Sequence, residues 1–80
     1  MDRVTIHGVI LSDIYQVDDN NSEFYVRCLD SGRKIKIYAE NTLLSKVFNG
    51  LSLDSKAIIN GYAPSAINTF EIEATSFIKI

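Results

Sequence analysis

The chain has 80 residues and a formal net charge of −2, with 46% hydrophobic and 22% charged residues. This length allows one domain with a small core, and the composition is that of a globular protein rather than a disordered one. No apolar run approaches the roughly 20 residues that cross a bilayer, so we expect neither a membrane span nor a signal peptide, and the acidic balance excludes a chain that is basic throughout.

A single cysteine, Cys28, excludes an internal disulfide, and no cysteine and histidine residues have the spacing of a zinc site. We therefore expect a protein of the reducing cytoplasm that holds no metal or cofactor and contacts no membrane. One residue in four is β-branched, and such side chains are stiff at χ1 and pack well on a pleated sheet. The composition favours an all-β fold.

The first predicted strand is long and spans Arg3–Val17. Apolar residues occur on both of its faces near Gly8, and a glycine within a strand indicates a bend where the strand passes from one sheet to another. A polar loop, Asp18–Ser22, follows. Because one small chain has few ways to cover two apolar faces, we expect Arg3–Leu11 to form the interface of a homodimer or higher oligomer.

Two strands, Glu23–Leu29 and Arg33–Ala39, form the clearest predicted hairpin. Opposed residues share a face, so pairing Arg27 with Lys34 or Lys36 requires a loop of two or four residues, which we place around Ser31-Gly32 with a positive φ at Gly32. The predicted core face consists of Phe24, Val26, Cys28, Ile35, Ile37 and Ala39. The predicted outer face consists of Tyr25, Arg27, Lys34, Lys36 and Tyr38.

The apolar spacing then changes from strand period to helical period, which predicts a helix within Asn41–Asn49 with Asn41 as its N-cap. Two further predicted strands, Lys56–Tyr62 and Thr69–Ile80, lie on either side of a loop at Ala63–Asn68. The apolar face of the helix consists of Leu43, Leu44, Val47, Phe48 and Leu51.

The predicted order is three strands, one short helix and two strands, in a single domain that covers residues 1–80. Among small β folds this order is characteristic of the five-stranded OB barrel, a Greek-key barrel whose second and third strands bind oligonucleotides. An SH3-like barrel also has five strands but seldom has a helix between the third and fourth. We predict an OB barrel with its helix at that place.

Two segments carry a family resemblance. Val4–Asp13 resembles the opening strand of bacterial single-stranded-DNA-binding proteins, with alternating aliphatic residues, a central glycine and a later acidic residue. Ile35–Gly61 is similar to the third strand, helix and fourth strand of that family, including a polar residue and a glycine at Asn60-Gly61. The resemblance implies non-enzymatic binding of single-stranded DNA with little sequence preference.

The sequence also departs from that family, since it has no tryptophan, no glycine-rich linker and no acidic tail. In these respects it is similar to the tail-less primosomal replication protein B family, or to a reduced single-strand binder from a phage or mobile element. The resemblance thus implies a role in DNA replication or in the maintenance of such an element.

Charge is unevenly distributed along the sequence. The stretch Tyr25–Ala39 carries four cations and one acid, whereas the remainder carries four cations and nine acids. Cations attract the phosphate backbone and aromatic rings stack on unpaired bases, so this hairpin is the predicted nucleic-acid site. The predicted contact residues are Tyr25, Arg27, Arg33, Lys34, Lys36 and Tyr38, with Tyr62 extending the aromatic surface.

Two alternatives stay open. Basic residues and tyrosine pairs also stabilise a half-buried hairpin that binds nothing, and Asp18-Asp19 near the site would repel phosphates. The chain would then be a protein-interaction module, an accessory subunit of a larger replication protein or complex, with weak or no nucleic-acid binding. RNA is the alternative ligand to DNA.

The sequence indicates no catalytic site. His7 has no cysteine or serine partner in any motif, Cys28 alternates onto the core face, and no phosphate-binding glycine loop is present. Glu71 and Glu73 lie two residues apart on one strand face, where such a pair is usually solvated, and we expect Glu71 to lie away from the hairpin face. We predict a binding protein and not an enzyme.

Overall fold

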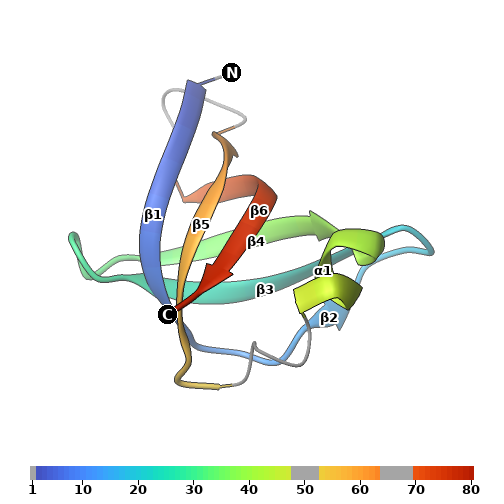
Figure 1. Cartoon of the computed structure of the whole chain (residues 1–80), viewed down its shortest axis with the longest axis horizontal. Helices are drawn as coiled ribbons and strands as arrows, with labels where there is room; N and C mark the ends of the chain where they lie inside the picture. The colour runs from blue at the N-terminus through green and yellow to red at the C-terminus, as the bar shows by residue number, and fades with distance from the viewer. Residues whose placement is uncertain (1, 48–52, 64–69) are drawn as a thin grey trace.

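The computed structural model of the chain describes residues 2–47, 53–63 and 70–80. These residues form strands and one short helix, so the predicted all-β class is confirmed (Figure 1). The helix has seven residues, and none in these ranges is long and apolar enough to cross a membrane. The elements are β1 (Asp2–Ile10), β2 (Tyr15–Gln16), β3 (Asn21–Cys28), β4 (Lys34–Glu40), α1 (Asn41–Val47), β5 (Lys56–Ala63) and β6 (Glu71–Lys79).

Hydrogen bonding joins the strands in the order β1-β5-β6-β4-β3-β2, and a further pairing of β1 with β3 closes a barrel. Neighbouring strands are antiparallel except β4 and β6, which are parallel. With the two-residue β2 set aside, this is the five-stranded OB topology, and α1 joins the third and fourth barrel strands as predicted. In Figure 1, α1 and β2 lie at the end of the β3–β4 hairpin opposite to its loop.

The prediction of one continuous first strand is wrong, because β1 ends at Ile10 and pairing resumes only in the two residues of β2. The side chain of Ser12 contributes to this break. Its Oγ accepts the backbone N–H of Tyr25 at 2.9 Å, in place of a carbonyl oxygen of a continuing strand. The chain therefore leaves the sheet between the two strands.

The predicted role of Gly8 is confirmed by the pairing of β1. Asp2–Val9 pairs with β5, whereas Gly8–Ile10 pairs with β3, so the strand passes from one half of the barrel to the other at this glycine. A Cβ at Gly8 would lie 3.2 Å from Cβ and Cγ2 of Val26. The bend thus brings β1 against the core side chains of β3.

The structure confirms that Arg27 lies opposite a lysine on the same face of the predicted hairpin, and that the loop has one of the two predicted lengths. Arg27 pairs with Lys34, and Cys28 donates to the carbonyl oxygen of Arg33 at 2.8 Å, which leaves a loop of four residues. The loop is centred one residue earlier than predicted, because the Gly32 N–H donates back to the Cys28 carbonyl at 2.8 Å. Gly32 has a φ of 72°, as its position requires.

The core lies inside the barrel and includes all six hairpin residues predicted for it. Cys28 is among them, as a small buried side chain. Phe70 precedes β6, and 45% of its surface is exposed. The larger buried side chains from other elements are Ile10, Leu44, Ile59, Ile72 and Phe77.

β5 and β6 approach each other closely at Gly61. A Cβ at this position would overlap the carbonyl oxygen of Glu73 and lie 2.9 Å from the Cα of Ala74. The register shifts at the same place, since Asn60 pairs with Ser76 and Gly61 with Ala74. Thr75 is therefore the extra residue of a β-bulge, a feature that bends a strand.

The helix begins at Asn41, the first residue of the predicted range, and the side chain of this residue ties the helix to the strands. Asn41 Oδ1 accepts the Ser22 hydroxyl at 2.5 Å, and Asn41 Nδ2 donates to the Asp19 carbonyl oxygen at 3.1 Å. The predicted helix end at Asn49 and the predicted loop at 64–68 lie outside the described residues.

Candidate nucleic-acid interface

The outer face of the β3–β4 hairpin carries the five residues predicted there. They alternate with buried residues, and the register pairs Arg27 with Lys34 and Tyr25 with Lys36. Tyr38 pairs with Glu23, so a carboxylate shares this face. The structure thus brings the predicted side chains together, but not as a purely basic and aromatic surface.

The loop end of this face is basic. Lys34 Nζ lies 4.3 Å from the centroid of the Tyr25 ring, within the range of a cation–π contact. Arg27, which pairs with Lys34, is exposed and donates from Nη1 to the carbonyl oxygen of Gly32 at 2.8 Å. Two cations and one aromatic ring therefore lie side by side, and we call Tyr25, Arg27 and Lys34 the basic end.

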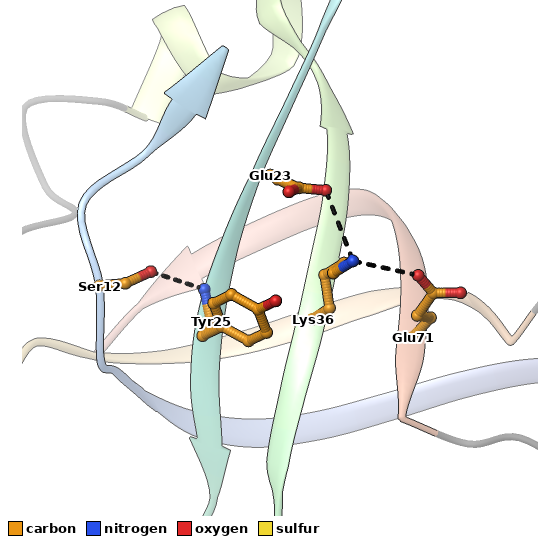
Figure 2. Close-up of polar contacts among 5 residues, drawn as sticks. All are labelled: Ser12, Glu23, Tyr25, Lys36 and Glu71. Carbon is orange, nitrogen blue, oxygen red and sulfur yellow. Dashed lines mark hydrogen bonds and ion pairs between the residues drawn. The ribbon is translucent and has the colours of Figure 1, made fainter. Parts of the chain in front are cut away.

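Lys36 lies between two carboxylates, which Figure 2 shows. Its Nζ is 3.8 Å from Glu23 Oε2 and 3.6 Å from Glu71 Oε1. The negative charge of Glu23 is the main cause that raises the pKa of Lys36, with Tyr25 and Glu71 adding to it. The positive charge of this ammonium group is therefore already balanced by two carboxylates of the protein itself.

The expectation that Glu71 lies away from the hairpin face is wrong. β6 runs parallel to β4 with Lys36 paired to Glu71 and Tyr38 paired to Glu73, so both acids lie on the same face as the hairpin residues. Glu71 contacts Lys36 directly, and a variant at this position is no neutral control for nucleic-acid binding.

Arg33 and Tyr62 lie apart from the basic end. The guanidinium carbon of Arg33 is 5.2 Å from the ring centroid of Phe70, and Arg33 lines an apolar hollow at the barrel end with Ile35 and Ile72. Tyr62 is on β5, where it pairs with Glu73, and the Arg3 guanidinium lies 5.9 Å from its ring centroid. Five of the seven predicted site residues therefore share the hairpin face, while Arg33 lies at the barrel end and Tyr62 lies beyond Glu73 on β5.

Two aromatic residues extend the candidate surface beyond the predicted set. Tyr15 pairs with Glu23 and so shares the hairpin face, with 69% of its surface exposed. Phe70 lies under Arg33 beside the start of β6. The sequence signal for Tyr15 was its place in a strand-like run with the same parity as Val9, which pairs with Arg27 on the outer face.

The acidic loop lies at the opposite end of the face from the basic end. The Asn41 N–H donates to the Asn20 carbonyl oxygen at 2.7 Å, which holds this loop beside α1. Within it, the N–H groups of Asn20 and Asn21 each donate to Asp18 Oδ1 at 2.8 Å, and these bonds lower the pKa of the Asp18 carboxyl. Its negative charge is thus stabilised far from Lys34.

The arrangement offers phosphate and base contacts at one end of the hairpin face and carboxylates at the other. Electrostatic attraction of a polyanion is therefore confined to the loop end, since like charges repel it elsewhere. The chain was compared with protein-family models, curated proteins and solved structures, and none of them matches it.

Proposed function

We propose that the chain binds single-stranded DNA, without enzymatic activity, through the basic end of the β3–β4 face. The observation that carries this proposal is the ammonium group of Lys34 at 4.3 Å from the Tyr25 ring, with Arg27 as its cross-strand partner. Phosphates pair with the two cations, and an unpaired base stacks on the ring. Little sequence preference is expected, because every base has a π-face.

Neighbouring acids limit the extent of the proposed contact. Glu23 and Glu71 neutralise Lys36, and Glu73 follows on the same face. A single strand that continued along the hairpin toward α1 would bring phosphates against these carboxylates. We therefore expect a contact of few nucleotides, with modest affinity and a strong dependence on salt.

The biological setting is proposed from the resemblance to bacterial single-stranded-DNA-binding proteins and to primosomal replication protein B. It favours a part in DNA replication or in the maintenance of a phage or mobile element. A cytoplasmic location is in keeping with the one cysteine, which is a free thiol in the barrel core. RNA is the alternative ligand, since neither stacking nor phosphate attraction distinguishes it from DNA.

Titration of labelled oligo-dT at several salt concentrations tests this proposal. Lys34→Ala is expected to weaken binding and to flatten the log–log salt dependence by up to about 0.7 for each phosphate that the variant no longer neutralises. Lys36→Ala is the matched control, because it removes the same charge from a side chain already paired with two carboxylates. Failure of the parent to bind at low salt would contradict the proposal. An equal change of slope in both variants would contradict the placement of the site.

A second candidate is an interaction module that assembles through β1. This strand pairs with β5 over Asp2–Val9 but with β3 only over Gly8–Ile10, so one edge of residues 2–6 has no strand partner within the described ranges. An unpaired edge is a template for a strand from another chain. The partner would be a second copy or a larger replication protein.

Light scattering tests whether the chain associates with a second copy of itself through β1. At high micromolar concentration the expected mass is that of a dimer or larger oligomer, and dilution should shift it toward the monomer. A monomer at every concentration would count against β1 as a homodimer interface. Loss of oligo-dT binding on oligomerisation would instead show that the two candidates compete for one surface.

A further inference from the structure

A hollow of about 500 Å³ lies where α1 meets β4, β5 and β6, at the end of the hairpin face opposite to Lys34. Two tyrosines, Tyr38 and Tyr62, are among the residues that line it, together with the acids Glu40 and Glu73. Leu43 from α1 contributes an apolar part. Among the described residues, those that line the hollow include two acids and no cation.

The strand register places one of these acids between the two tyrosines. Glu73 on β6 pairs with Tyr38 on β4 and with Tyr62 on β5, so the three residues form one row across three neighbouring strands. The β-bulge at Thr75, which also lines the hollow, lies directly after this row. The same bend of β6 that accommodates Gly61 therefore shapes this surface.

The two carboxylates are available to a ligand. Within the described part of the chain, the two ion pairs join Lys36 to Glu23 and Glu71, and neither Glu40 nor Glu73 takes part in one. Arg3, whose guanidinium lies 5.9 Å from the Tyr62 ring centroid, does not line the hollow. The two acids of the lining are thus left without a cationic partner among the described residues.

This combination selects a particular ligand chemistry. Aromatic rings attract cations through their quadrupole, carboxylates attract them by charge, and an apolar wall favours methyl or methylene groups over a hydrated metal ion. Phosphate is repelled by the same carboxylates. We propose that this hollow binds an alkylammonium group, from a small organic amine or from a lysine side chain. The inference is independent of DNA binding, since it uses neither Lys34 nor Arg27.

The test uses two cationic probes on the whole chain, choline for a small amine and Nα-acetyl-lysine methylamide for a protein side chain. The neutral analogue of choline, 3,3-dimethyl-1-butanol, serves as the ligand control. Binding is followed by amide chemical shifts in ¹H–¹⁵N spectra. Shifts are expected at Thr42, Glu73 and Thr75 for at least one cationic probe, and the tighter probe identifies the source of the ammonium group.

Two variants define the site. Glu73→Gln and Tyr62→Leu are each expected to raise the Kd of the cationic probe about fivefold, the equivalent of about 1 kcal/mol. Glu71→Gln is the matched control, because it removes the same charge two residues away on β6 from a side chain outside the hollow lining, and less than a twofold change is expected.

Three results would overturn the inference. They are binding of the neutral analogue as tight as that of choline, chemical shifts that map away from α1 and β6, and a rise of Kd in Glu71→Gln equal to that in Glu73→Gln. The last result would show that the weaker binding follows from the overall charge of the chain and not from the position of Glu73. Oligo-dT titration of the same variants separates this inference from the proposed function, because Glu73→Gln should not weaken DNA binding.

Discussion

Gly61→Ala is expected to lower the melting temperature of the chain by about 12–24 °C, from a cost of about 3 kcal/mol. The added methyl group would overlap the carbonyl oxygen of Glu73, and the obstacle is backbone, which cannot move aside as a flexible side chain does. The site also adjoins the β-bulge, where the register of β5 and β6 is set. Thermal unfolding followed by circular dichroism measures the effect.

The matched control is the same substitution at Gly32. This glycine has a φ of 72° and no heavy atom within 4 Å of the position that the new methyl group would take, so Gly32→Ala carries only the backbone strain. That strain costs about 1 kcal/mol, or roughly 4–8 °C for a domain of this size. A Gly32→Ala variant as unstable as Gly61→Ala would contradict the close approach of β5 and β6.

Tyr25→Ala is expected to weaken oligo-dT binding by about 1–3 kcal/mol, the usual cost of removing one base–aromatic stack. The ring also lies under Lys34, so its removal frees the ammonium group from its 4.3 Å contact without removing the charge. The slope of binding against salt should therefore change less than in Lys34→Ala. Fluorescence titration at two salt concentrations measures both quantities.

Two controls accompany this variant. Tyr25→Phe keeps the ring and is expected to bind like the parent, whereas Tyr38→Ala should have a smaller effect because Tyr38 lies between Glu23 and Glu73. Circular dichroism must first show that each variant is folded, since tyrosines also stabilise cross-strand pairs. Equal binding by Tyr25→Ala and the parent would remove Tyr25 from the site.

The sequence was sufficient to predict the barrel because its main signals are local. Alternation at Phe24, Val26 and Cys28 depends only on the two-residue period of a strand, and it identified the core face. Gly8 and Gly32 marked a bend and a turn for the same local reason. The end of β1 was missed because a serine side chain 13 residues away supplies the competing bond to Tyr25.

The candidate surface was harder to predict because its charge balance depends on strands distant in sequence. Glu23 could have been assigned to it, since it has the same parity as Tyr25 and lies just outside the basic stretch. Glu71 could not, because only the parallel pairing of β4 with β6 places it beside Lys36. Tyr25–Ala39 carries four cations and one acid, a net charge of +3. That value describes a segment of the chain and not a surface of the barrel.

The last described strand has a central position in the barrel, between β5 and β4. During synthesis, the edge of β4 that will receive β6 therefore stays open while the chain grows by about 40 residues, from Glu40 to Lys79. At typical translation rates this interval lasts roughly 2–8 s. Every newly made chain thus presents an unpaired strand edge before the barrel can close, and a chaperone or a second nascent chain has those seconds to reach it.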